Sequence, residues 1–202
     1  FPEFHRDVLE SLRQPLEEGR ITILRAKEKL TLPANFTMIA AANPCPCGYY
    51  KDPNKLCQCQ PSQIAKYKRK LSGPLIDRID ILIEVPPVKF EKLASPDQEQ
   101  QSSKIREKIE KTRQAQKQRF EKESSSILLN SEMGIPEIKK YCQVDEKSQD
   151  ILGRFVDSGK LSGRGYHRVL KVARTIADLE ESEKISYNHV TEALMYRIKE
   201  EQ

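Results

Sequence analysis

The sequence predicts an α/β part followed by an all-helical part, with a charged connector between them. Alternating and continuous apolar segments, which are typical of strands, occur before residue 94. Between residues 94 and 126 apolar residues become rare, and Gln, Lys, Glu and Ser dominate. From Ile135 onward apolar residues recur every three or four positions, which indicates helices. We therefore expect domains over residues 1–93 and 127–202, joined by a solvent-exposed helical connector over 94–126.

The first part is expected to open with a helix over residues 4–16, where apolar residues repeat every four positions. A hairpin should follow over residues 19–32, because two alternating segments flank a short polar stretch. Residues 35–42 form a nearly continuous apolar run, which is typical of a central strand in a parallel sheet, and residues 79–85 form a second strand candidate. Asn43 follows the first run, at the end of a strand where ligands bind in open α/β sheets.

The helical part contains three residues that can cap the start of a helix. Asp145 can cap a helix that runs to about Asp157, and Ser162 can cap a longer one. Ser186 can cap the last helix. The apolar spacing after each cap predicts a small helical bundle.

The composition indicates a soluble globular chain with a modest core. Its 202 residues are 37% hydrophobic and 32% charged, and the formal net charge is +5. This charge permits contact with a polyanion without requiring it, and most cations alternate with acidic residues as on a solvated surface. No apolar run approaches the roughly 20 residues that span a bilayer. No signal peptide is visible, but the first residue is Phe1 and not Met, so this absence carries little weight. We expect a cytoplasmic protein with no membrane partner.

Four of the five cysteines form a cluster that can hold a metal. Cys45 and Cys47 make one Cys-x-Cys pair, and Cys57 and Cys59 make another nine residues later. In a cytosolic chain such a cluster favours metal ligands over disulfides, and four thiolates can enclose Zn²⁺ tetrahedrally. One intervening residue is fewer than the usual two to four, so a thiol-lined loop without metal is the alternative. Either role is structural, since no His or carboxylate is placed to complete an open catalytic site.

Arg78 lies where a Gly73-Pro74 turn leads into the second strand candidate. From the residues alone, the simplest interpretation is a surface ion pair of Arg78 with Asp77 or Asp80. A functional role for this guanidinium needs evidence beyond the local sequence.

Two arginines lie at the start of the helix that Ser162 caps. Arg164 and Arg168 are four positions apart, so they share one helix face. Gly163 and Gly165 would let a phosphate approach, and a helix N-terminus favours anions. An anion site and an ordinary helix start with solvated arginines are both consistent with this pattern.

Four blocks of sequence resemble the ComM/YifB branch of the magnesium-chelatase-like AAA+ ATPases. They cover most of the chain in this order: FHRDVLESLRQPLEEG at 4–19, PANFTMIAAANPCPCGY at 33–49, SGPLIDRID at 72–80 and RGYHRVLKVARTIADL at 164–179. Several long blocks in the right order are more specific than any single motif. The resemblance implies a partial AAA+ module, in which a parallel-sheet core fragment with a presensor hairpin precedes a helical lid bundle.

The resemblance also implies roles for single residues. Asn43 matches the sensor-1 residue, which positions the attacking water or senses the γ-phosphate. Arg78 matches the arginine finger, which reaches the ATP of a neighbouring subunit. Arg164 matches the sensor-2 residue of the lid, and Arg168 is a second candidate for that site. Lys27 and Lys29, in the hairpin, would face the pore of a homo-oligomeric ring, expected to be a hexamer, and contact DNA.

Two motifs of the family do not occur in these 202 residues. One is the phosphate-cradling Gly-x-x-x-x-Gly-Lys-Ser/Thr loop (Walker A), and the other is an apolar run that ends in Asp-Glu (Walker B). The resemblance places the acidic pair immediately before Phe1. It follows that the residues that bind ATP phosphates and Mg²⁺ lie outside this segment. The segment alone is not expected to hydrolyse ATP.

The resemblance thus implies a fragment of an ATP-dependent ring motor that acts on DNA in competence or recombination. One alternative is the ATPase subunit of a magnesium chelatase in tetrapyrrole synthesis, against which the cysteine cluster argues. Another is a zinc-stapled nucleic-acid-binding module without enzymatic activity. A phosphate-binding loop upstream of this segment would exclude the latter.

Overall fold

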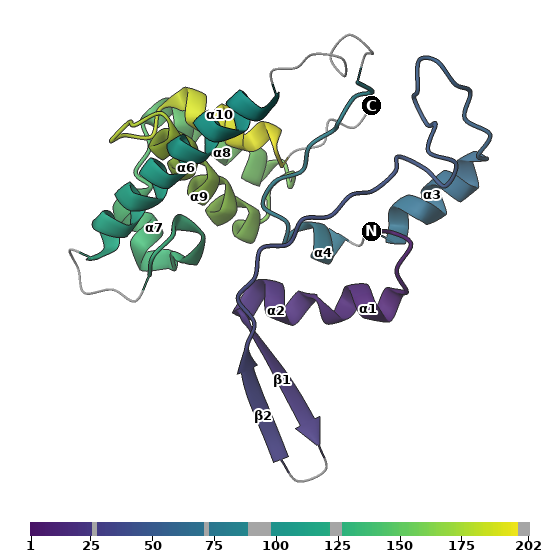
Figure 1. Ribbon diagram of the computed structural model, residues 1–202, viewed down its shortest axis with the longest axis horizontal. Coiled ribbons are helices and arrows are strands. Elements are labelled where there is room, and N and C mark those ends of the chain that lie inside the picture. The colour runs from purple at the N-terminus through teal and green to yellow at the C-terminus, as the bar shows by residue number, and fades with distance from the viewer. Residues whose placement is uncertain (26–27, 71–72, 89–97, 122–126, 198–202) are drawn as a thin grey trace. The chain divides into compact units, whose positions relative to one another are not determined.

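The computed structural model describes residues 1–25, 28–70, 73–88, 98–121 and 127–197 (Figure 1). The chain divides into two compact units, residues 1–79 and residues 80–202, each with its own internal contacts. We describe each unit by itself. Among the described residues, none of the helices combines the length and the apolar character that crossing a membrane requires.

The first unit consists of short helices and one antiparallel hairpin. Its elements in chain order are α1 (Arg6–Ser11), α2 (Arg13–Glu18), β1 (Arg20–Arg25), β2 (Glu28–Pro33), α3 (Pro61–Lys70) and α4 (Gly73–Ile76). The described residues that it buries are few: Pro2, Leu9, Pro15, Cys45, Tyr67 and Leu75. Two elements, α3 and α4, were not predicted from the sequence.

The helix predicted over residues 4–16 is present but broken at Leu12. Pro15 explains the break, because it has no N–H to donate to Ser11 and its ring crowds the carbonyl of that residue. The second piece, α2, ends at Gly19, whose backbone is left-handed with φ 62°. A side chain at Gly19 would also overlap the amide of Asn35, so glycine is required there for two reasons.

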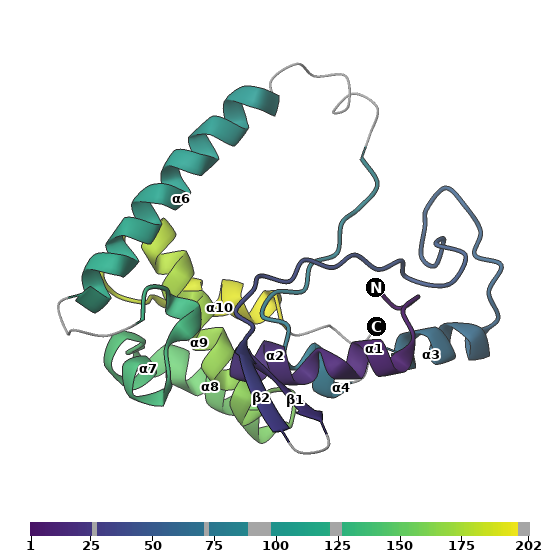
Figure 2. The same cartoon turned by 60° about the horizontal axis from the view of Figure 1, so that its bottom comes forward.

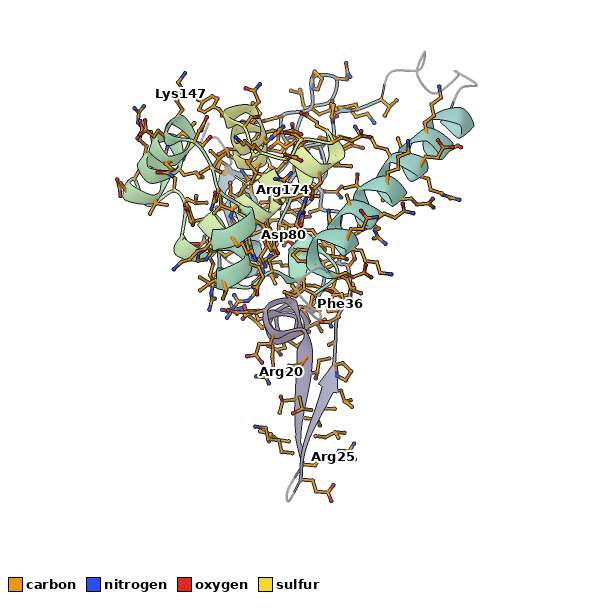
Figure 3. The ribbon with its side chains drawn as sticks, turned by 90° about the vertical axis from the view of Figure 1, so that its left-hand side faces the viewer. Arg20, Arg25, Phe36, Asp80, Lys147 and Arg174 are labelled. Carbon is orange, nitrogen blue, oxygen red and sulfur yellow. The ribbon has the colours of Figure 1, made fainter. Side chains whose placement is uncertain are left out.

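The predicted hairpin is confirmed as β1 and β2. Its register pairs Arg20 with Pro33 and Arg25 with Glu28. Figure 3 shows Arg20 at the base of the hairpin and Arg25 near its tip. The side chain of Gln14 in α2 lies 3.4 Å from both the N–H and the hydroxyl of Thr22, which ties the base of the hairpin to the helix.

The two strands predicted over residues 35–42 and 79–85 are absent from the structure. Both segments lack regular secondary structure, and within the described part of the chain only β1 and β2 pair. A strand needs a neighbouring strand for its backbone hydrogen bonds, and within the described residues these runs make only isolated ones, such as those from Leu82 to Tyr196 and from the N-terminus to Ala41. Their apolar side chains are correspondingly uncovered, with Ile39 93% and Val85 78% exposed.

The second unit begins with an irregular segment at Asp80, and its helices are a long one and those of a helical bundle. Its elements are α6 (Gln98–Glu121), η1 (Asn130–Glu132), α7 (Ile135–Tyr141), α8 (Glu146–Asp157), α9 (Gly163–Leu179) and α10 (Tyr187–Met195). The helix expected within residues 94–126 is present as α6, but it belongs to this unit and its end is buried at Phe120. Figure 2 shows one end of α6 beside the bundle and the other end extending away from it. The sequence predicted a sparse apolar face on α6, but only Phe120 of that face is buried, while Ile105 and Ile109 remain exposed.

Two of the three predicted caps, Asp145 and Ser162, are confirmed by side-chain hydrogen bonds, whereas Ser186 takes the cap position of α10 without one. The carboxylate of Asp145 accepts the N–H of Ser148 at 2.9 Å, and the hydroxyl of Ser162 accepts the N–H of Gly165 at 3.1 Å. Ser186 precedes α10, and its own N–H donates to the imidazole of the buried His189 at 3.0 Å. Around α9, the described core contains mostly aliphatic side chains: Leu152, Val169, Leu170, Ala173, Ile176, Ala177, Val190 and Leu194.

One buried carboxylate links three elements of this unit. Asp178 in α9 accepts from Arg119 of α6 at 2.9 Å and from Arg174 at 3.1 Å. It also accepts from the amide of Asn130, in η1, at 2.8 Å. Arg174, labelled in Figure 3, donates further to the carbonyl of Glu183 at 2.7 Å. Asp178 and Arg174 are only 6% and 3% exposed, so this network fixes the packing of α6 and α9 from inside the unit.

Candidate functional site

The four clustered cysteines lie within reach of one metal ion. Their sulfur atoms all lie within 4.8 Å of one another. Cys45 is fully buried, and its Sγ lies 3.4 Å from that of Cys47 and 3.7 Å from that of Cys57. Cys47 and Cys57 are 3.6 Å apart. The structure thus brings together residues that the sequence places in two separate pairs.

These distances fit tetrahedral zinc and exclude disulfides. Zn–S bonds of about 2.3 Å place the sulfurs of a tetrahedral site about 3.8 Å apart. A disulfide requires sulfurs at about 2.05 Å, and all four thiols are free. The donor set is four sulfurs with no oxygen or nitrogen, as in structural zinc sites rather than catalytic ones.

Backbone turns shape the loop that carries these cysteines. The N–H of Gly48 donates to the carbonyl of Cys45 at 3.0 Å, and Gly48 has a left-handed φ of 86°. Further along, the carboxylate of Asp52 accepts the N–H groups of Asn54 at 2.7 Å and Lys55 at 3.0 Å. Both turns reverse the chain, so that the two Cys-x-Cys pairs face each other.

The thiols of the cluster ionise differently. Backbone hydrogen bonds at Tyr49 and Gln58 lower the pKa of Cys47 to about 6. A backbone hydrogen bond at Cys59 acts to lower the pKa of Cys57, but burial and contacts with the other thiols outweigh it and raise this pKa to about 12. A divalent cation among the sulfurs favours the thiolate form of all four. The fifth cysteine, Cys142, is buried in the other unit, where burial raises its pKa to about 11.

Arg78 lies just after α4, with its side chain largely buried. Its Nη1 donates to the carbonyl of Pro74 at 2.6 Å, and its Nη2 pairs with the carboxylate of Glu17 at the end of α2. Among the described contacts Arg78 pairs with Glu17 and with neither Asp77 nor Asp80, so the simplest interpretation is wrong about the partner. Asp80 pairs with Arg168. Arg78 follows a short helix and not a turn into a strand, because Gly73–Ile76 forms α4.

Asn43 belongs to the same unit as Arg78 but is exposed, in the segment between β2 and α3 that lacks regular structure. Within the described residues no hydrogen bond or ion pair joins the two side chains. Lys29, in β2, is exposed beside the tip of the hairpin, opposite Leu24. Lys27 lies outside the described residues.

The arginines at the start of α9 have different environments. Arg164 is exposed in the first turn of the helix, whereas Arg168 pairs with the carboxylate of Asp80. The sequence suggested that Gly165 leaves space for a phosphate, but in the structure this space is filled. A side chain there would lie 2.8 Å from both Leu161 and the guanidinium of Arg197, so this glycine permits close packing. At Gly163, by contrast, no atom lies within 4 Å of the position that a side-chain Cβ would take, so an anion can approach.

Comparison with known families and proteins identifies the chain's relationship. Residues 1–93 match the family described as magnesium chelatase, subunit ChlI, and residues 99–197 match the C-terminal part of the same subunit. The chain belongs to the magnesium-chelatase-like family. The resemblance seen in the four sequence blocks is therefore confirmed.

Relatives within this magnesium-chelatase-like family align over nearly the whole chain. Competence protein ComM of Haemophilus influenzae is 42% identical over 197 residues, which cover 97% of this chain and 37% of the relative. Protein YifB of Escherichia coli is 37% identical over 200 residues, with the same coverage. A Mycobacterium tuberculosis protein is 33% identical over 195 residues, which cover 96% of this chain and 38% of the relative. The chain thus spans little more than a third of the length of these relatives.

The sequence did not identify Glu17 as a partner of Arg78. The two residues are 61 positions apart, and Glu17 is one of two consecutive acidic residues at a helix end, where nothing marks it as special. The basic helix α3 directly after the cysteines was also missed. Its Lys68, Arg69 and Lys70 could have indicated it, because cations favour the last turn of a helix.

Proposed function

We propose that the chain is the C-terminal part of an ATP-dependent AAA+ ring motor that acts on DNA in the cytoplasm, as a hexamer. The observation that carries this proposal is the pair of family matches, which together run through both units in the order that the family has. A chain that keeps both parts of a chelatase-like ATPase subunit is best explained as part of such an ATPase. The residues that hold ATP phosphates and Mg²⁺ then belong to the remaining two thirds of a protein of the relatives' length.

In this proposal Arg78 is the arginine finger of the neighbouring subunit's ATP site. Glu17 and the carbonyl of Pro74 hold the guanidinium in a defined orientation at the end of α4. A cation at this position would stabilise the charge that develops on the transferring phosphoryl group, and to reach it Arg78 would have to exchange the carboxylate of Glu17 for a phosphate. Asn43 would orient the attacking water from its own subunit. Its exposed position leaves the side chain accessible to a nucleotide.

Arg164 is proposed as the sensor-2 residue, which contacts ATP from the helical lid. It lies in the first turn of α9, where the backbone N–H groups and the helix dipole both favour an anion. Arg168 is a second candidate for the same site. Its pairing with Asp80 means that it would have to exchange a carboxylate for a phosphate.

DNA is the proposed substrate of the motor, with Lys27 and Lys29 of the hairpin facing the pore. The relative from Haemophilus influenzae is a competence protein by name, and the family resemblance implies a motor that acts on DNA in competence. Lys29 is exposed, as a phosphate contact requires. The four-cysteine loop argues against the alternative role in tetrapyrrole synthesis, because a magnesium chelatase subunit is not expected to carry such a cluster.

The full-length protein is expected to hydrolyse ATP, and DNA is expected to stimulate the turnover. The measurement is steady-state phosphate release with Mg²⁺, with and without single-stranded or duplex DNA. Stimulation by DNA supports the motor and its substrate together. Turnover that DNA does not change would contradict the choice of substrate, and a protein that binds no ATP would contradict the motor.

Zinc is proposed as the metal of the four-cysteine loop. We expect about one zinc per chain by elemental analysis, because four sulfurs at these spacings form a complete tetrahedral site. Replacing Cys45 and Cys47 together by Ser should remove the zinc, since two ligands do not hold it. The matched control is Cys142→Ala, which removes a cysteine from the other unit and should leave the zinc content unchanged. Wild-type protein without zinc but with an intact fold would refute this part.

A further inference from the structure

The excess positive charge of the chain is concentrated in one segment. Residues 44–70 contain six of the 35 Lys and Arg residues and only one of the 30 Asp and Glu residues. The rest of the chain therefore contains 29 cations and 29 anions, and the formal net charge of +5 comes from this segment alone. Zinc with four thiolates would add a charge of about −2, so the segment stays positive when the site is filled.

These cations are exposed on the cysteine loop and on α3. Lys51 and Lys55 lie on the loop, and the other four lie on the helix: Lys66, Lys68, Arg69 and Lys70. Apart from Ile64 and Tyr67, every residue of α3 is exposed. The helix dipole explains why three cations occupy its last turn, but it does not explain the two on the loop or the absence of acidic residues from α3.

Two tyrosines lie among these cations. The ammonium group of Lys55 lies 4.9 Å from the ring centre of Tyr49, and that of Lys68 lies 4.9 Å from the ring centre of Tyr50. Lys51 lies 5.9 Å from the ring centre of Tyr50. All three contacts lie within the roughly 6 Å over which a cation is attracted to a ring face. Cations and aromatic faces are thus presented together.

The surface is hollowed beside Tyr49. One shallow depression is lined by Cys47, Tyr49, Asn54, Lys55, Leu56 and Gln58. Leu56 is 93% exposed at its edge, and Tyr49 is 38% exposed. A second depression, on the other side of Cys47, is lined in part by Lys66 and Lys70 together with the single acidic residue Glu3. Flat apolar and aromatic groups next to amide and ammonium donors suit an unpaired base and its phosphates.

We infer that the cysteine loop and α3 together form a binding surface for single-stranded nucleic acid, separate from the hairpin lysines. The lysines and Arg69 contact the phosphate backbone, and a base stacks on Tyr49 beside Leu56. Single strands fit better than duplexes, because only an unpaired base exposes a face to an aromatic ring. The inference rests on the proposed function in taking DNA as the polyanion, but it does not require ATP.

The test is binding of the full-length protein to a fluorescent oligo-dT strand of about 20 nucleotides, without ATP, at several salt concentrations. Tyr49→Ala should weaken binding about tenfold, whereas Tyr49→Phe should keep the wild-type affinity because the ring is retained. The triple variant Lys55→Gln, Lys66→Gln and Lys70→Gln should weaken binding and lower the slope of log K against log salt by about 2. Zinc content confirms that each variant retains its loop.

The matched control removes the same charge from α6, in Lys104→Gln, Lys108→Gln and Lys111→Gln, and should bind as wild type. Wild-type binding by the loop variants, an equal loss in the α6 control, or an equal effect of Tyr49→Ala on a duplex would overturn the inference. Basal ATP turnover, measured in the same samples without DNA, separates the two claims. If ATP turnover persists while the loop variants bind the oligonucleotide normally, only the inference about the binding surface fails. If the wild-type protein shows no ATP turnover, the proposed motor function fails as well.

Discussion

Arg78→Ala is expected to lower the kcat of the full-length protein for ATP by about a thousandfold or more, the typical contribution of an arginine finger. The guanidinium would act on charge that develops during phosphoryl transfer and not on bound ATP, so the affinity for ATP should change little. The measurement is steady-state turnover with DNA present, together with equilibrium binding of a fluorescent ATP analogue.

Arg6→Ala is the matched control for this variant. Arg6 is an exposed arginine of α1 in the same unit, and its removal should leave turnover unchanged. Glu17→Gln provides a second check, because it removes the charge that orients Arg78 while keeping the arginine. A smaller loss of kcat with normal ATP binding is expected there. Wild-type turnover in Arg78→Ala would remove this residue from the catalytic site.

Asp178→Ala is expected to reduce the free energy of unfolding of the helical unit by about 3–5 kcal/mol. The substitution leaves Arg119 and the buried Arg174 without their shared carboxylate, and it removes an acceptor from Asn130. A buried cation without a counter-ion costs more than the lost contact itself. The measurement is urea unfolding followed by circular dichroism.

Asp150→Ala is the control for this loss of stability. Asp150 is an exposed residue of α8, and surface substitutions of this kind change stability by about 0.5 kcal/mol or less. If Asp178→Ala unfolded at the same urea concentration as this control, the network would have no structural role. The network is the part of the helical unit that the sequence did not reveal.

Local signals predicted the helical unit well. Asp145 and Ser162 accept backbone N–H groups at the helix starts, as predicted, because a cap is decided by residues two or three positions apart. The hairpin was predicted for the same reason. The helix predicted over residues 4–16 begins two residues later, at Arg6, and ends two residues later, at Glu18; it is broken at Leu12, where the effect of Pro15 on the preceding turn was not considered.

Features that depend on distant partners were not predictable in the same way. The runs 35–42 and 79–85 have the composition of strands, yet composition does not supply the neighbouring strand that a ladder needs. The pairing of Arg78 with Glu17 joins two helix ends, and the sequence pointed to Asp77 or Asp80 instead.

The cysteine cluster was predictable because its ligands lie within fifteen positions of one another. Two short turns are enough to bring the two pairs together, and the structure shows those turns. The roles of Asn43, Arg78 and Arg164 came only from the resemblance to a family. The local sequence favours a surface ion pair for Arg78 and does not decide between an anion site and an ordinary helix start for Arg164, so these roles stay predictions.

The most direct test of a ring motor with shared ATP sites mixes two inactive variants of the full-length protein. Arg78→Ala subunits keep Asn43, and Asn43→Ala subunits keep Arg78, so about a quarter of the interfaces in a mixed ring combine both intact residues. We predict that each variant alone is nearly inactive and that the mixture recovers about this fraction of wild-type ATP turnover. A mixture that assembles but remains as inactive as its components would contradict catalysis across a subunit boundary.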